Sequence, residues 1–201
     1  MAFKISGLII IIFLSVGCIS CKTSEKEINK LDIAKRYYKI LDKADDDAIA
    51  LLLGDSIVIR ENESDYQETF TKKRYSEWLK WDAVFVPTYK ILEIEQDRDI
   101  VKAKISKIDR RILFLHEQPM VWNEIIRFEN NKIIKVERVL YEVFNVSRFL
   151  KNRDSLVSWI EKNHPELNGF LNDQTEAGGI KYLKAIELLE ASNLSTSEYA
   201  N

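Results

Sequence analysis

Cysteine is missing from most of this chain. Both of its cysteines, Cys18 and Cys21, lie near the start of the 201 residues. The rest of the sequence therefore offers no disulfide, no thiol nucleophile and no cysteine ligand for a metal. The chain also has no phosphate-binding glycine loop among its six glycines. For the pair Gly178 and Gly179, inside a helical pattern, we expect close packing against a neighbouring element, with backbone contact to a ligand as the alternative.

Histidine is almost as scarce as cysteine. The two histidines, His116 and His164, have no partner at helical or hairpin spacing. We expect His116 in the middle of a strand and His164 as a capping residue before Pro165, at the start of a helix. The sequence therefore predicts no metal site, no cofactor and no serine triad, since each of these needs a cluster that includes histidine or similar ligands.

A bias toward one sign of charge is also absent. The formal net charge is -2, and lysines and arginines alternate with acidic residues along the whole length. No basic block interleaved with aromatic residues occurs, so we expect no nucleic-acid partner. With 46% hydrophobic residues, the chain has the composition of a globular protein. Its length suits one domain with appendages and is too short for two full domains.

The first residues have the pattern of an export signal. Lys4 is followed by the apolar run Leu8–Leu14, which is too short to span a bilayer, and then by Ser15–Cys18. Gly17-Cys18 resembles the lipobox of bacterial lipoproteins. That resemblance implies a signal peptide at 1–17, lipidation of Cys18 and a tether at 18–29, and it places the protein in the bacterial cell envelope, anchored to a membrane. An ordinary signal peptide or an uncleaved anchor is the alternative.

Three helices and a strand are predicted in the first half of the chain. Apolar residues at helical spacing predict a helix over Lys30–Ala44, and a second helix follows the acidic cap candidates Asp45–Asp47 and ends at Gly54. Alternation predicts a strand over Ser56–Glu61. After a polar stretch, Asn62–Phe70, a third helix starts at a Thr71 cap.

Beyond Pro87 the apolar period changes to two, which predicts two β-hairpins. The first pairs Tyr89–Glu95 with Ile100–Ile108, and the second pairs Ile112–Phe128, with a bulge or bend at Pro119, with Ile133–Glu142 through Asn130-Asn131. Residues 144–191 return to helical patterns. The predicted helices here are Arg148–Asn163, a short one from Pro165, and Glu176–Leu189 after a Thr175 cap, and 192–201 are expected to be a disordered tail. Helices first and a run of long strands later indicate the α+β class.

The order and spacing of these elements resemble the NTF2-like, or SnoaL-like, family. The residues that carry the resemblance are Arg36-Tyr37-Tyr38, the helix start Asp45-x-Asp47-x-Ile49, Leu52–Asp55 before the strand, Arg127-Phe128, and Asn131–Ile134. The resemblance covers about Leu31–Glu142. It implies a cone at 30–143, with a curved antiparallel sheet wrapped on the N-terminal helices around a cavity. Residues 144–191 would then be a helical extension packed on this domain as a flank or lid.

Within this family, Tyr37–Glu61 is similar to the ketosteroid isomerases without a gap. The similarity implies an oxyanion-hole donor at Tyr37, a proton-shuttling carboxylate at Glu61 and a protonated acid at Glu124. Together they would support enolisation, in which a carboxylate removes a proton next to a carbonyl while two donors stabilise the oxyanion. Arg138, however, has the strand position of an inward-facing residue near Glu124. A guanidinium there favours a buried ion pair or an anionic ligand instead.

Three functions follow from the sequence. The first is a non-catalytic, envelope-anchored domain that binds a small apolar or amphipathic ligand, or a protein partner; Trp78, Trp122 and Tyr37 would line its pocket, and Arg138 with Glu124 would orient a polar group. The second is an isomerase, dehydratase or cyclase with Glu61 as base and Tyr37 as donor. The third is a homodimer with a filled cavity, formed through the outer sheet face at Lys135, Glu137, Val139 and Tyr141.

Overall fold

The computed structural model of the protein describes residues 29–198. The predicted signal peptide, the Cys18 lipidation site and all of the predicted tether except Asn29 lie outside the described residues. Within 29–198, no helix combines the length and apolar character needed to cross a bilayer.

The described chain forms helices and a single six-stranded sheet, which confirms the predicted α+β class. In chain order, the elements are α1 (Lys30–Lys43), α2 (Asp46–Leu52), β1 (Leu53–Glu61), β2 (Tyr66–Thr71), α3 (Lys72–Ala83), β3 (Thr88–Asp97), β4 (Ile100–Ile108), α4 (Arg110–His116), β5 (Met120–Glu129), β6 (Lys132–Val143), α5 (Val146–Asn163), the short 3₁₀ helix η1 (Pro165–Leu167) and α6 (Glu176–Glu198).

The helix starts follow from side chains that cap them. Asn29 accepts a hydrogen bond from the backbone N–H of Leu31 at the start of α1. Asp45 caps α2 through the N–H of Ala48, and Thr71 caps α3 through the N–H of Arg74, as predicted. Such caps satisfy backbone donors that have no partner inside the helix, and so they determine where each helix begins.

The strand order in the sheet is β2-β1-β6-β5-β4-β3. All neighbours are antiparallel except β1 and β6, which are parallel, so the sheet is mixed rather than purely antiparallel as predicted. The β5–β6 turn has positive φ at Asn130 (48°) and Asn131 (59°), which is the conformation that a two-residue Asn-Asn hairpin requires. The parallel pair brings the end of β1 beside the middle of β6, and both contribute to the cavity described below.

Two elements differ from the sequence prediction. The polar stretch before Thr71 contains a strand, β2, because pairing with the edge of β1 satisfies its backbone despite its polar side chains. Residues 112–116, predicted as the first part of a long strand, belong instead to the helix α4. Asp109 caps this helix through the N–H of Ile112, and Glu117 ends it with a positive φ of 65°. A short apolar run such as this one fits a strand or a helix equally well by its pattern.

His116 is therefore at the end of α4 and not in the middle of a strand. It is fully buried, and Pro119 lies between α4 and β5 rather than within a strand. His164 follows α5 and makes no side-chain capping bond to η1. Its Nδ1 lies 3.2 Å from a Glu166 carboxylate oxygen on the surface.

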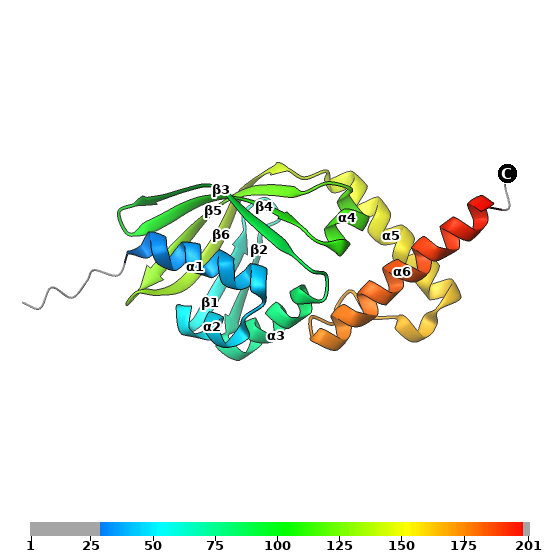
Figure 1. Cartoon of the computed structure of the whole chain (residues 1–201), viewed down its shortest axis with the longest axis horizontal. Coiled ribbons are helices and arrows are strands. Elements are labelled where there is room, and N and C mark those ends of the chain that lie inside the picture. The colour runs from blue at the N-terminus through cyan, green and yellow to red at the C-terminus, as the bar shows by residue number, and fades with distance from the viewer. Residues whose placement is uncertain (1–28, 199–201) are drawn as a thin grey trace, which may run out of the picture.

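Two hydrophobic clusters hold the molecule together. The first lies between α1, α2, α3 and the sheet, around Ile49, Ile57 and Ile126. The second joins α3 and α4 to the helical extension; its buried members are Trp81, Phe85, Leu115, Leu156, Ile160, Phe170, Tyr182, Ala185 and Ile186. Figure 1 shows α1 lying against the sheet, and α4, α5 and α6 gathered at one end of it. The helices of the extension thus share a buried core with α3 and α4.

The extension approaches α3 closely at one glycine. A Cβ atom at Gly179 would lie 3.0 Å from the Trp81 carbonyl oxygen, so only glycine allows this contact without a shift. This is the close packing expected for the glycine pair. Helix α6 also runs to Glu198, past the predicted end at Leu189 and into the segment predicted to be disordered. The residues after Leu189 are mostly polar, but none is a glycine or proline that would end a helix.

Candidate functional site

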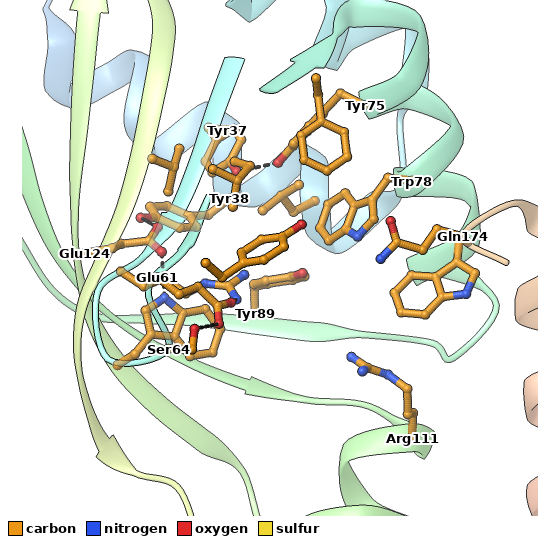
Figure 2. A pocket seen from close by; sticks show the side chains of 18 residues that line it. Tyr37, Tyr38, Glu61, Ser64, Tyr75, Trp78, Tyr89, Arg111, Glu124 and Gln174 are labelled. Atoms are coloured by element: carbon orange, nitrogen blue, oxygen red, sulfur yellow. Dashed lines mark hydrogen bonds and ion pairs between the residues drawn. The ribbon is translucent and has the colours of Figure 1, made fainter. Parts of the chain in front are cut away.

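A cavity of about 470 Å³ lies between α1, α3 and the concave side of the sheet. It is lined by all six residues that the sequence predicted for catalysis or ligand binding: Tyr37, Glu61, Trp78, Trp122, Glu124 and Arg138. Figure 2 shows these side chains and their neighbours around it. The predicted residues are thus together in space, although they come from five separate elements. Their roles have to be judged from their contacts.

Glu61 pairs with Arg138 in the cavity wall. Because β1 and β6 are parallel with Glu61 opposite Arg138, the two side chains leave adjacent strands on the same face. The Arg138 guanidinium donates a hydrogen bond to Glu61, and it lies 4.9 Å from the centre of the Trp122 ring. The sequence analysis expected Arg138 to pair with Glu124. That expectation is wrong, because the ion pair that Arg138 forms is with Glu61. The correct partner depends on the pairing of β1 with β6, which brings together residues far apart in sequence.

Arg138 remains charged in this position. Burial alone would lower its pKa, but the neighbouring Tyr141, Glu61 and Glu124 outweigh burial and hold the pKa well above its usual value. Tyr141 was expected on the outer face of the sheet. The β5–β6 pairing shifts register between Asn123 and Glu124, and Tyr141 packs against Trp122 instead. A bulge of this kind breaks the alternation on which the prediction depended.

Glu124 is buried, with 4% of its surface exposed, and both of its carboxylate oxygens accept hydrogen bonds. Tyr38 donates its hydroxyl to one oxygen, and Trp122 Nε1 donates to the other at 2.6 Å. Burial of Tyr38, together with the charge of Glu124, raises the pKa of this hydroxyl well above its usual value, so Tyr38 stays a donor. In this arrangement Glu124 accepts and does not donate, whereas the isomerase resemblance implied a protonated donor.

Tyr37 forms a pair with Tyr75 of α3. Their hydroxyl oxygens are 2.5 Å apart, and both rings are buried. Burial raises the pKa of both hydroxyls, and for Tyr37 the neighbouring Tyr75 adds to the rise. The pair therefore stays neutral over the physiological range. One of its two hydroxyl hydrogens is used within the pair, which leaves the other as a donor for a ligand.

Several residues of the cavity were not singled out in the sequence. Tyr38 and Tyr75 face the cavity from the apolar rows of α1 and α3, and their helical spacing was visible as a core pattern only. Arg111 and Gln174 line it from α4 and from the loop before α6. Gln174 lies beyond Leu31–Glu142, the segment that carried the resemblance, and its part in the cavity follows only from how the extension packs. Arg111 lies within that segment, but it reaches the cavity from α4, a helix that the sequence analysis did not predict.

A buried ionic cluster supports one wall of the cavity. Lys107 on β4 is 7% exposed; it contacts Asp82 of α3 and lies 3.3 Å from Asp109, and both carboxylates are fully buried. Tyr89, which lines the cavity, donates its hydroxyl to Asp82 at 2.9 Å. These contacts join α3, β3 and β4, so they rigidify the wall on which Tyr89 stands. Among residues 29–198, no group of three His, Cys, Asp or Glu side chains is arranged to hold a metal ion.

Comparisons with known proteins concern the fold and not the site. No family model matches the sequence, and no curated protein matches it. Similar solved structures include a protein provisionally called a ketosteroid isomerase from Kribbella flavida, with 11% identity, a TM-score of 0.47 and coverage of 58% of this chain and 80% of that one. An NTF2-like protein of unknown function from Cytophaga hutchinsonii has 9% identity, a TM-score of 0.45 and coverage of 59% and 94%. A provisionally named polyketide cyclase from Sinorhizobium meliloti has 15% identity, a TM-score of 0.45 and coverage of 53% and 93%.

Proposed function

We propose that the chain is a non-catalytic binding domain that holds a small apolar or amphipathic molecule in the cavity. The observation that carries this proposal is that both cavity carboxylates already accept hydrogen bonds from side chains of the protein itself. Glu61 accepts from Arg138, and Glu124 accepts from Tyr38 and Trp122. A general base needs a free lone pair within reach of the proton that it removes. Here each oxygen of the two carboxylates already contacts a donor of the protein itself, Arg138 and Ser64 at Glu61 and Tyr38 and Trp122 at Glu124, so a substrate proton would have to compete with these donors.

The cavity wall supports binding of an apolar body. Aromatic rings from several elements line it, and its volume of about 470 Å³ is in the usual range for small-molecule pockets. The side chains do not fill it, which disagrees with the filled cavity of the dimer hypothesis. Several of its polar side chains are already held by partners within the protein, as Glu61 is by Arg138 and Tyr37 by Tyr75, an arrangement that orients a ligand without reacting with it.

We further propose that the domain works at the bacterial cell envelope, attached to a membrane through a lipid on Cys18. This part rests on the export pattern of the first residues, Leu8–Leu14 followed by Gly17-Cys18. A lipid anchor would keep the cavity near a membrane surface, where amphipathic molecules concentrate.

Binding can be tested with a neutral probe, 6-phenylhexanamide, added to the full chain in phosphatidylcholine nanodiscs. Three of the four tryptophans, Trp78, Trp81 and Trp122, line the cavity, so tryptophan fluorescence should change in a saturable way with one probe per chain. Ile59→Trp places a bulky ring in the cavity, and we expect it to weaken binding about tenfold or more. Val58→Trp, next in the strand and absent from the cavity wall, is the matched control. No saturable change in the unmodified chain would refute the proposal.

An isomerase acting beside a carbonyl is the second candidate, and the buried Tyr37–Tyr75 hydroxyl pair favours it. Such a pair can donate to a developing oxyanion. The test is the conversion of a β,γ-unsaturated ketone to its conjugated isomer, compared between the unmodified chain and Glu61→Gln. We expect equal rates for both proteins. A rate about 100-fold higher for the unmodified chain would establish Glu61 as a base and replace the binding proposal.

A further inference from the structure

The cavity has a second polar end, away from Glu61 and Glu124. Arg111 of α4, Trp81 of α3 and Gln174 of the loop before α6 line this end. Figure 2 shows Glu61 and Glu124 on one side of the cavity and Arg111 and Gln174 on the other. Helices α3 and α4 and the helical extension thus supply this end of the cavity, whereas the sheet and α1 supply the other.

Two hydrogen-bond donors at this end are buried and unpaired. Arg111 Nε and Trp81 Nε1 have no hydrogen-bond partner within the described part of the chain, and Trp81 is only 6% exposed. Buried donors are nearly always paired, because an unpaired one loses its bonds to water without replacement. Arg138 Nε, at the other end of the same cavity, is likewise unpaired, and the two donors at this end therefore indicate a ligand that brings acceptor atoms. The Gln174 amide can add a third donor from the same wall.

The Arg111 guanidinium is held in a fixed orientation by aromatic rings. Its centre lies 5.0 Å from the Trp81 ring and 5.5 Å from the Phe85 ring. Its nearest acidic neighbour, Asp109, is 3.8 Å away, beyond hydrogen-bonding distance, and that carboxylate also faces Lys107 at 3.3 Å. In formal charge, the two bases Arg111 and Lys107 balance the two acids Asp82 and Asp109. What Arg111 offers a ligand is therefore a set of well-oriented donors on a charged group, the geometry that binds carboxylates side on.

The two ends of the cavity differ in the ligand groups that they fit. At one end, the carboxyl groups of Glu61 and Glu124 already lie beside the guanidinium of Arg138, which makes this end a poor fit for a further anionic group. We propose that Arg111, Trp81 and Gln174 form a carboxylate-binding subsite, and that the ligand is an amphipathic acid whose apolar body extends along the aromatic wall toward Glu124. This inference rests on the proposed binding function and specifies its ligand class. It also gives the helical extension a role, since Gln174 belongs to it.

The test compares 6-phenylhexanoate with 6-phenylhexanamide, two probes of similar size that differ in the carboxylate. Both are titrated into the full chain in phosphatidylcholine nanodiscs at pH 7.5, with tryptophan fluorescence as the readout. We expect the acid to bind about tenfold more tightly than the amide. Arg111→Met should abolish this preference, because the methionine side chain still packs on the rings but cannot pair with a carboxylate.

Arg110→Met is the matched control, since Arg110 is adjacent in α4 but pairs with Glu190 on the surface. It should keep the full preference. If Arg111→Met does not fold, Gln174→Leu in the loop provides a second test, and we expect it to reduce the preference for the acid about threefold. Equal affinity for the two probes, or an undiminished preference in both Arg111→Met and Gln174→Leu, would overturn the subsite. Absence of binding by either probe would instead refute the proposed binding function.

Discussion

Glu124 shows how neighbouring donors decide what a buried acid can do. Its two oxygens accept from Tyr38 and from Trp122, so the carboxylate is satisfied without a ligand. Removing one acceptor from such a network leaves a buried donor unpaired, which costs more than the hydrogen bond itself was worth. We therefore propose that Glu124 stabilises the cavity wall. This role can be measured as a change in the free energy of unfolding when Glu124 is substituted.

Glu124→Gln should lower the free energy of unfolding by about 1–3 kcal/mol, because the amide nitrogen cannot accept from Tyr38 or Trp122. The measurement is urea denaturation followed by tryptophan fluorescence. Glu129→Gln is the control, since Glu129 is exposed at the end of the same strand, and it should change stability by less than about 0.5 kcal/mol. A Glu124→Gln protein as stable as the original would show that the carboxylate is not needed as a double acceptor.

At the scale of elements, α4 connects the sheet to the extension. Its last residue, His116, is fully buried between two backbone groups. Nδ1 lies 2.9 Å from the Gln118 carbonyl oxygen, and Nε2 accepts the N–H of Asn145 at 2.7 Å. This pattern matches the tautomer with its hydrogen on Nδ1, which donates at one nitrogen and accepts at the other. Asn145 is also the N-cap of α5, so this histidine determines where the extension begins.

His116→Leu should destabilise the protein by about 1–3 kcal/mol, because the Asn145 N–H becomes a buried donor without an acceptor. Hydrogen exchange in the first turn of α5 should be faster than in the unmodified protein. His164→Leu is the matched control, since its side chain is more exposed and its contacts, with Glu166 and the Trp159 ring, lie outside the buried core. The two variants should differ clearly in thermal unfolding. Equal melting temperatures would contradict the structural role of His116.

At the scale of the whole molecule, most tyrosines of the described chain are buried or half-buried around the cavity and the extension, and Tyr66 is 39% exposed. Burial raises the pKa of every tyrosine in the described chain: Tyr37, Tyr38, Tyr66, Tyr75, Tyr89, Tyr141 and Tyr182. The folded protein thus keeps these protons to a higher pH than the unfolded chain does. Above the usual tyrosine pKa of about 10, unfolding releases protons and becomes more favourable.

We therefore expect the tyrosines to contribute fully to the free energy of unfolding below about pH 10. Their contribution should fall steeply as the pH rises from there toward the folded-state pKa values. Absorbance at 295 nm reports tyrosine ionisation, and circular dichroism reports the fold. The two signals should change together in one transition. Ionisation of most tyrosines while the circular dichroism stays native would show that the hydroxyls are not held in a buried environment.

Much of the candidate site was predictable because it depends on local patterns. The helical spacing of Tyr37 and Trp78 and the strand alternation around Glu61 and Trp122 indicate which face of each element is buried. Once these elements pack around one cavity, such residues have to lie on its wall. The caps at Asp45 and Thr71 were predictable for the same reason, since a cap acts within a few residues of itself.

The partners of these residues were decided only by the tertiary structure. Glu61 pairs with Arg138 because two distant strands align in parallel, and Glu124 is satisfied by a tyrosine from α1. Arg111 lies in the cavity wall because Asp109 starts a helix where the apolar pattern also allowed a strand. The sequence by itself determined the class of fold and which faces are buried, because periodicity and capping are local. The pairing of charges, and which donors remain unpaired, depend on contacts between residues far apart in the chain. Such contacts form only when the elements pack together.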